Sequence, residues 1–210
     1  MCYGDSLTWG YIPDTNHQRH LANVRWPGVL QDLLGNNYEV IEEGLNSRTL
    51  ISNDPRSGKE GRSGREYLIP CLDTHDPIDL VILLLGGNEL KDIYQMSAKK
   101  IGEIVEKEFV QIILNRKSQF LVKTPKLLLI PPPIMDLSKK YAYDRFANSA
   151  EKNKKLVQIF KKIAQENSCL FLDVTKRVTV GADGVHLNGG NQKKLAKAIA
   201  AIIINSSKDA

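Results

Sequence analysis

Three residues of this 210-residue sequence have the types and spacing that nucleophilic catalysis uses. Ser6 lies in the run Gly-Asp-Ser-Leu directly after a short apolar segment, where a strand end can present its hydroxyl in a cleft. Near the other end of the chain, Asp183 precedes His186 by three residues, so the carboxylate can orient the imidazole as a general base. Singly, such a serine is more often a helix cap, and an Asp-x-x-His pair is as often structural or a metal site.

Two further residues can supply hydrogen-bond donors to the same reaction. Asn88 follows two glycines and can bring a side-chain amide close to a substrate, while Gly44 lets a bare backbone N–H approach. Each alone is typical of a turn. With the backbone N–H of Ser6 they make three donors for one developing oxyanion. The joint occurrence of all these groups therefore predicts acyl transfer.

The elements that must position these residues are visible as alternating strands and helices. Continuous apolar runs predict strands, and longer periodic segments predict helices. The predicted strands span residues 1–3, 39–41, 80–85, 127–130 and 170–172, and the predicted helices span 26–34, 67–72, 98–120, 147–167 and 190–205. This alternation predicts an α/β fold with a parallel sheet covered on both faces. The candidate residues follow predicted strands, so they would meet at the carboxyl edge of the sheet, where such folds bind ligands.

Composition excludes several classes of protein. With 42% apolar and 25% charged residues, the chain reads as an ordinary globular protein, and its length fits one domain over residues 1–210. The longest apolar runs, 80–85 and 198–204, are shorter than the roughly 18 residues that cross a bilayer, so we expect no membrane association. Three cysteines and no basic-then-apolar leader favour a reduced, cytoplasmic setting.

Charge and histidine content limit the possible partners and cofactors. The net charge is +5, but the basic residues are scattered and form no recognised nucleic-acid module, so we expect no nucleic-acid partner. Four histidines without a His-Glu-x-x-His run or a cysteine cluster predict no metal. The long loop at residues 46–66 is basic and can attract a carboxylated substrate or form a subunit contact, although a solvated loop is the favoured interpretation.

The order Gly-Asp-Ser-Leu, Gly, Gly-x-Asn-acid and Asp-x-x-His resembles the SGNH hydrolase family, also called GDSL esterases and lipases. Its four named positions correspond to Ser6, Gly44, Asn88 and His186. Stretches along nearly the whole chain look like the bacterial arylesterase branch, whose members include acyltransferases with perhydrolase activity. These stretches are residues 4–10, 25–26, 40–44, 48–49, 67–72, 77–88 and 183–187.

This resemblance implies a three-layer α/β/α sandwich with a five-stranded parallel sheet in the flavodoxin-like order 2-1-3-4-5. It implies a serine esterase that acts on acetyl and short-chain aryl or alkyl esters, needs no cofactor, and forms a homo-oligomer. Ser6 would be the nucleophile, His186 the base and Asp183 its orienting group. Ser6, Gly44 and Asn88 would form the oxyanion hole, with acyl transfer or perhydrolysis as side activities. The remaining residues expected to contact the small-molecule ester are Asp5, Leu7, Trp9, Asn46, Gly87 and Val185.

Two positions depart from the branch. Gly87 stands where a threonine is common, and Glu89 stands where an aspartate is common. Glu89 keeps the charge and reaches one methylene further, whereas Gly87 removes a side chain beside the oxyanion hole. These departures bear on acyl preference and on how firmly Asn88 is held.

Two alternatives remain open at this stage, and a third, an α/β-hydrolase, is set aside. A carbohydrate O-acetylesterase needs the same groups, and Trp9, Tyr11 and Trp26 offer stacking surfaces, although core packing is the commoner role of such rings. A non-catalytic binding module would keep the cleft without the reaction. An α/β-hydrolase is disfavoured because Thr8 replaces the last glycine of the Gly-x-Ser-x-Gly elbow.

Overall fold

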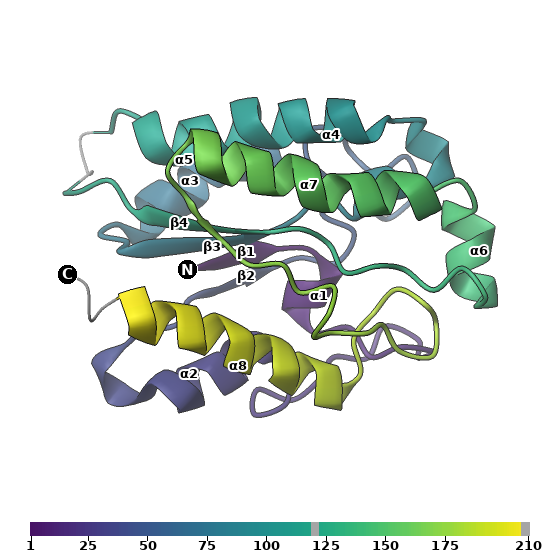
Figure 1. Cartoon of the computed structure of the whole chain (residues 1–210), viewed down its shortest axis with the longest axis horizontal. Coiled ribbons are helices and arrows are strands. Elements are labelled where there is room, and N and C mark those ends of the chain that lie inside the picture. Colours follow the sequence, from purple (N-terminus) through teal and green to yellow (C-terminus); the bar gives the residue numbers. More distant parts are fainter. Residues whose placement is uncertain (119–121, 207–210) are drawn as a thin grey trace.

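The computed structural model of the chain describes residues 1–118 and 122–206, and a five-stranded parallel sheet forms its centre (Figure 1). The strands follow the order β2-β1-β3-β4-β5, which confirms the predicted sheet. Their bounds are β1 Cys2–Gly4, β2 Glu42–Gly44, β3 Leu80–Leu84, β4 Lys126–Ile130 and β5 Leu170–Phe171.

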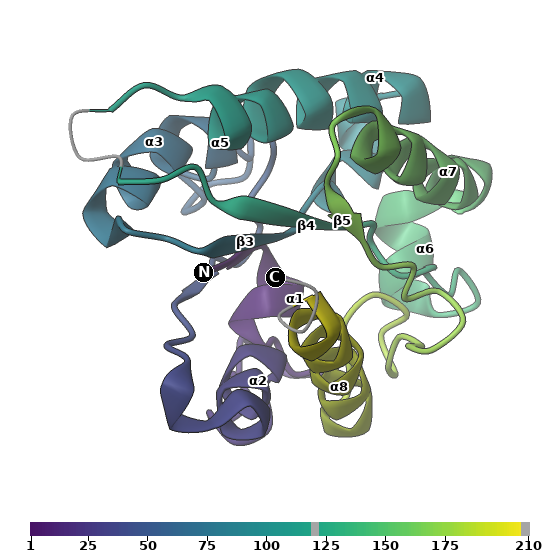
Figure 2. The ribbon, with the colours of Figure 1, turned by 60° about the vertical axis from the view of Figure 1, so that its left-hand side comes forward.

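Helices cover both faces of the sheet. In Figures 1 and 2, α2 and α8 lie together on one side, and α3, α4, α5 and α7 lie on the other. The helices are α1 Ser6–Trp9, α2 Trp26–Leu34, α3 Gly64–His75, α4 Ala98–Val105, α5 Gln111–Asn115, α6 Lys140–Phe146, α7 Ala150–Glu166 and α8 Gly189–Ser206. The predicted three-layer α/β/α arrangement is therefore correct.

Burial on both faces explains why β3 is apolar throughout. Successive side chains of a strand point to opposite faces. Val81 and Leu83 accordingly join the core beneath α3, α4 and α7, whereas Ile82 and Leu84 join the core beneath α2 and α8. Trp26, at the start of α2, is completely buried in the second core.

The second strand lies three residues beyond its predicted position. The prediction placed it on the apolar residues 39–41, but β2 is Glu42–Gly44, which pairs residue for residue with β1. This strand is at the edge of the sheet, so Glu42 and Glu43 can reach partners outside it: Glu42 bonds Arg25, and Glu43 bonds His75. An apolar run was therefore a misleading signal for a half-buried edge strand.

The observed helix boundaries differ most from the predicted ones where a helix changes from α-helical to π-helical geometry. The helix predicted over residues 98–120 is α4, then a π-helical stretch Glu106–Val110, then α5, which ends at Asn115. The predicted end at Phe120 lies outside the described residues. The short helices α1 and α6 were not predicted at all. Within the described ranges, no helix combines the length and apolar character that a membrane crossing requires.

Candidate active site

Ser6 is the first residue of α1, which begins two residues after β1 ends, with Asp5 between them. Asp5 caps this helix, because its Oδ1 accepts the backbone N–H of Leu7 at 2.9 Å. The strand ends at the carboxyl edge of the sheet, so this turn places the half-buried Ser6 hydroxyl at that edge.

The loop after β5 brings His186 to Ser6. The Nε2 atom of His186 lies 2.9 Å from Ser6 Oγ although the two residues are 180 positions apart. On the other side of the ring, Nδ1 lies 2.6 Å from Oδ2 of Asp183. A proton on Nδ1 is held by the carboxylate, which leaves Nε2 as an acceptor for the serine hydroxyl. The structure thus brings the three residues together in the order that serine activation requires.

Asp183 is held as an ionised carboxylate. The residue is 2% exposed, and its Oδ1 accepts the backbone N–H groups of Val185 and His186, each at 2.9 Å. Burial by itself would raise the pKa of Asp183, but hydrogen bonds from His186 and Val185 and the charge of the imidazole outweigh burial and lower it. The group that orients the ring is therefore negative at neutral pH.

Asn88 starts a 3₁₀ turn, Asn88–Leu90, four residues after β3. Its side-chain Nδ2 donates to the carbonyl of Arg48 at 2.9 Å, and Oδ2 of Asp5 lies 3.4 Å away. The first bond is firm and the second is long. One N–H of the amide is thus held by the backbone, and the other can be given to an oxygen in the cavity.

Gly44 ends β2 and packs against the back of α1 instead of lining the cavity. A Cβ atom at this position would lie 2.3 Å from the backbone N of Trp9 and 2.6 Å from the backbone C of Thr8. Only glycine allows this approach. The structure therefore places two of the three predicted oxyanion donors, Ser6 and Asn88, on the cavity wall and the third behind α1.

A cavity of about 340 Å³ opens at Ser6 and His186. Its volume lies at the small end of the range for small-molecule sites. The predicted site residues that line it are Asp5, Ser6, Leu7, Asn46, Gly87, Asn88, Val185 and His186. At Gly87 a Cβ atom would meet only ordinary contacts, the nearest being Pro132 Cβ at 3.5 Å. Glycine at this position therefore enlarges the cavity, and the backbone packing does not require it.

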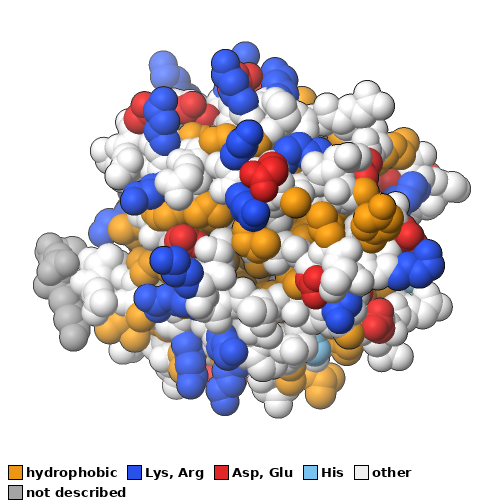
Figure 3. All heavy atoms as spheres, turned by 45° about the vertical axis from the view of Figure 1, so that its right-hand side comes forward, with side chains coloured by type: hydrophobic (Ala, Val, Ile, Leu, Met, Phe, Trp, Pro, Cys, Tyr) orange, Lys and Arg blue, Asp and Glu red, His pale blue; other side chains and the backbone are white. Residues whose placement is uncertain are grey.

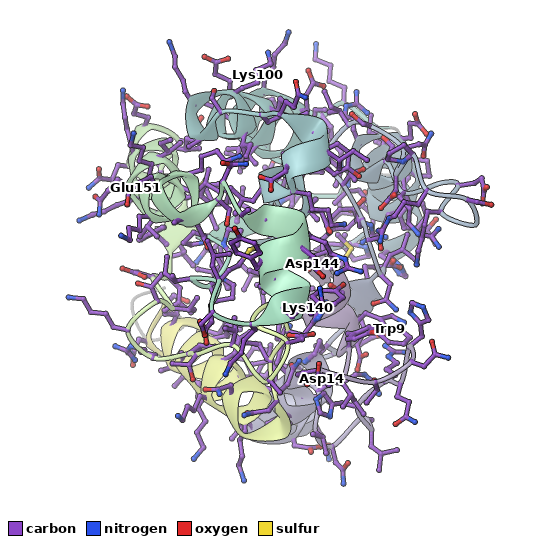
Figure 4. All side chains as sticks on the ribbon, turned by 90° about the vertical axis from the view of Figure 1, so that its right-hand side faces the viewer. Trp9, Asp14, Lys100, Lys140, Asp144 and Glu151 are labelled. Carbon is purple, nitrogen blue, oxygen red and sulfur yellow. The ribbon has the colours of Figure 1, made fainter. Side chains whose placement is uncertain are left out.

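Trp9 lies outside this cavity although the resemblance implied contact with the substrate. The Arg19 guanidinium lies 5.2 Å from the centre of its ring, and the Trp9 carbonyl accepts a hydrogen bond from Arg19 at 2.7 Å. Figure 4 shows Trp9 to the side of α6, on which Lys140 and Asp144 are labelled. Of the three aromatic residues considered for stacking, Tyr11 lines the cavity, with its ring centre 4.3 Å from that of His186.

Sequence reasoning missed a set of cavity residues contributed by α6 and the long loop. Tyr141 and Arg145 come from α6, which sequence periodicity did not reveal. Arg56 and Lys59 come from the loop at residues 46–66, whose basic character was the available signal. Lys91, just beyond the Asn88 turn, carried no signal. The loop is therefore partly a cavity wall, which corrects its favoured interpretation as a solvated segment.

One group of potential metal ligands lies away from the cavity. Glu43, Cys71 and His75 have ligand atoms within 4.8 Å of one another. Two of them already bond each other, since His75 Nε2 lies 2.8 Å from Glu43 Oε1. Burial raises the pKa of the Cys71 thiol to about 12, which opposes formation of the thiolate that binds metals. None of the three lines the cavity.

Comparison with known proteins places this chain among esterases. Residues 2–193 match the GDSL-like lipase/acylhydrolase family. A search of curated proteins found no match.

Solved structures similar to nearly the whole chain include an aryl esterase and carbohydrate acetylesterases. An aryl esterase of M. smegmatis has a TM-score of 0.89 and 32% identity, covering 97% of each chain. A carbohydrate acetylesterase from Sinorhizobium meliloti has a TM-score of 0.88 and 31% identity, also covering 97% of each chain. A carbohydrate acetylesterase family member from the same organism has a TM-score of 0.87 and 33% identity, covering 96% of this chain and 95% of that one.

Proposed function

This chain belongs to the GDSL-like lipase/acylhydrolase family and is an esterase, and we propose that it hydrolyses small acetyl and short-chain aryl or alkyl esters through an acyl-enzyme on Ser6. The observation that carries this proposal is the chain of contacts from Ser6 through His186 to Asp183, at 2.9 and 2.6 Å. The cavity of about 340 Å³ beside these groups supports a small substrate.

The first half of the reaction transfers the acyl group to the enzyme. Ser6 Oγ forms a bond to the ester carbonyl carbon while His186 Nε2 takes the hydroxyl proton, and the carbonyl electron pair moves onto oxygen. When this pair returns, the bond to the alcohol oxygen breaks, and His186 gives its proton to the leaving alcohol. Asp183 keeps the ring oriented and stabilises the imidazolium between these transfers.

The second half releases the acid. Water attacks the acyl carbon, His186 takes a proton from it, and the bond to Ser6 breaks as the proton returns to Oγ. An alcohol or hydrogen peroxide in place of water would give an ester or a peracid, so acyl transfer and perhydrolysis are expected side activities of the same intermediate.

The negative charge on oxygen in both halves requires fixed donors. We assign this role to the Ser6 backbone N–H and the Asn88 side chain, which belong to cavity-lining residues. The Gly44 N–H, which the resemblance implies as a third donor, belongs to a residue outside the cavity lining. Support is strongest for Asn88, because Arg48 fixes its amide in the cavity wall while leaving one N–H available.

The test is the reaction of the serine itself. Ser6→Ala should lower kcat/KM for 4-nitrophenyl acetate by about four orders of magnitude, and a fluorophosphonate should label Ser6 of the unmodified protein as seen by mass spectrometry. Ser138→Ala, which changes an exposed serine, serves as the matched control. Near-normal turnover by Ser6→Ala would exclude the mechanism.

A second candidate is removal of acetyl groups from carbohydrates. Similarity to two carbohydrate acetylesterases favours it. So does Asn46, a cavity-lining residue whose buried Oδ1 has no hydrogen-bond partner and would be satisfied by a hydroxyl donor. Side-by-side assays on acetylated sugars and aryl acetates separate the two candidates. Inactivity on every acetylated sugar would remove the second one.

A further inference from the structure

One wall of the candidate active site is cationic. Among the described residues that line the cavity, four have a lysine or arginine side chain: Arg56, Lys59, Lys91 and Arg145. The lining acid is Asp5, whose Oδ1 is occupied by the Leu7 N–H. Burial raises the pKa of Asp5, while His186, Lys91 and Arg48 act to lower it.

Lys91 is the most deeply placed of these cations. The residue is 7% exposed, and its Nζ lies 3.8 Å from Oδ2 of Asp54, which is too long for a hydrogen bond. A buried ammonium group has three donors to satisfy. Burial and the nearby charge of Arg56 lower its pKa to about 8, so it remains largely protonated at neutral pH. Lys91 thus lines the cavity as a buried cation with a distant partner.

The carboxylate nearest to Lys91 is already committed. Asp54 accepts hydrogen bonds from Arg56 at 2.8 and 2.5 Å, so one carboxylate serves two cations. Glu89 and Asp5 also act on Lys91, but Glu89 Oε1 accepts the backbone N–H of Leu50 and Asp5 Oδ1 accepts that of Leu7. The positive charge at this wall is therefore only partly balanced from within the chain.

The remaining two cations have no acidic partner among the described residues. The Arg145 guanidinium carbon lies 3.9 Å from the centre of the Tyr141 ring, and Nη1 donates to the Tyr141 carbonyl at 3.2 Å. The other two guanidinium nitrogens, Nε and Nη2, are left to solvent or to a ligand. Lys59 lies near two further cations, Arg56 and Arg62, which together with its burial lower its pKa. Such a wall suits an anionic ligand group.

Resting on the proposed esterase activity, we infer that the preferred substrates are esters carrying a second, anionic group, a free carboxylate, which binds at the wall formed by Lys91, Arg56 and Arg145. The carboxylate can lie on either side of the ester bond. It belongs to the acyl part in a monoester of a dicarboxylic acid, and to the alcohol part in the acetyl ester of a hydroxy acid. Lys59 lines the same cavity and adds to its positive electrostatic potential.

Matched substrate pairs test this inference and distinguish the two sources. For the acyl part, mono-4-nitrophenyl adipate is compared with its methyl ester. For the alcohol part, 4-acetoxybenzoate is compared with 4-acetoxybenzamide. On one of these arms kcat/KM should favour the carboxylate by about tenfold or more at low ionic strength, and this advantage should shrink as salt screens the charges. No carboxylate preference on either arm would overturn the inference.

Charge-removing variants locate the preference. Lys91→Met and Arg145→Gln should each reduce the carboxylate-to-neutral ratio of kcat/KM by about tenfold. Lys155→Met removes an exposed charge from α7 and controls for the change in net charge. If Lys91→Met fails to fold, the half-buried Arg145 decides the matter. An unchanged ratio in Arg145→Gln, or an equal fall in Lys155→Met, would contradict an anion site at this wall.

Failure of this inference and failure of the proposed function give different results. Hydrolysis of neutral aryl acetates that disappears in Ser6→Ala, without any carboxylate preference, would leave the esterase mechanism standing and remove the anion site. Hydrolysis that persists in Ser6→Ala would remove the mechanism itself.

Discussion

Asn88 both lines the cavity and has its side-chain amide held in place by a hydrogen bond. Its amide is anchored by the Arg48 carbonyl at 2.9 Å and lines the same cavity as Ser6. Because a donor fixed before reaction stabilises charge that develops in the transition state, Asn88→Ala should lower kcat by about 10² to 10³ with a smaller effect on KM. Steady-state kinetics on 4-nitrophenyl acetate measure this. A change in KM alone would show that Asn88 binds substrate without stabilising the oxyanion.

Glu89, the neighbour of Asn88, predicts a pH-dependent stability. Its carboxyl is 1% exposed, and burial raises its pKa from the ordinary 4.5 to about 7. The folded chain therefore keeps a proton that the unfolded chain loses, and the free energy of unfolding falls as pH rises from about 4.5 to about 7. Glu89→Gln should remove up to about 3 kcal/mol of this decrease.

Urea unfolding at pH 5 and pH 8 measures this effect. The exposed Glu151 offers a matched control, since Glu151→Gln should retain the decrease seen in the unmodified protein. The same difference between the two pH values in Glu89→Gln as in the unmodified protein would mean that this carboxyl does not titrate in that range.

At the scale of elements, the contact between β2 and α1 fixes the position of Ser6, the proposed nucleophile. Gly44 leaves no room for a side chain, because a Cβ atom would lie 2.3 Å from the backbone of Trp9 in α1. Gly44→Ala should lower the free energy of unfolding by about 1 to 3 kcal/mol. Because the same helix begins with Ser6, the variant should also lower kcat/KM at least tenfold, since catalysis is sensitive to small displacements.

The control for this prediction is a glycine with space around it. At Gly190, in the first turn of α8, a Cβ atom would meet nothing closer than Asn188 Oδ1 at 3.5 Å. Gly190→Ala should leave stability unchanged or slightly raised. Denaturant unfolding of both variants, alongside their kinetics, makes the comparison. Equal stability of the two variants would refute the proposed close packing.

At the scale of the whole molecule, the described surface carries exposed apolar side chains near the cavity. Ile93 and Tyr143 are each 60% exposed and lie on neighbouring elements, the turn Asp92–Tyr94 and α6. Figure 3 shows hydrophobic side chains across the middle of one face, with Lys and Arg spread above and below them. We call Ile93 and Tyr143 the apolar patch, because exposed apolar side chains on adjacent elements commonly form contacts between proteins.

We therefore expect a homo-oligomer, as the family resemblance also implies. Light scattering at micromolar concentration should give a mass of at least twice the 23.5 kDa of one chain. Ile93→Asp should shift the population toward the monomer if this patch forms the contact. A monomer in the unmodified protein would contradict the prediction.

The cytoplasmic setting and the lack of a nucleic-acid partner stay predictions. The three cysteines are unpaired, with Cys2 and Cys71 buried and Cys169 half-buried. Cell fractionation and a binding assay with a duplex at physiological salt would test these predictions.

The sequence by itself determined the layer architecture and predicted which residues would meet at the edge of the sheet. Apolar runs such as residues 80–85 are continuous because both faces of a central strand are buried, and their order fixed a parallel sheet. Ser6, Asn88 and His186 follow such strands, so the shared carboxyl edge predicted that they would meet. These features depend on local pattern and on connectivity, which a sequence carries directly.

Only the tertiary structure decided what surrounds those groups. The edge strand β2 is made of polar residues whose partners, such as Arg25 and His75, lie elsewhere in the chain. Arg145 reaches the cavity from α6 and Lys91 is buried beside it, while Trp9 turns away. Burial and charge balance depend on residues distant in sequence. For that reason the sequence indicated only the basic loop at residues 46–66, and the places of Lys91 and Arg145 in the cationic wall could not be inferred before the chain was folded.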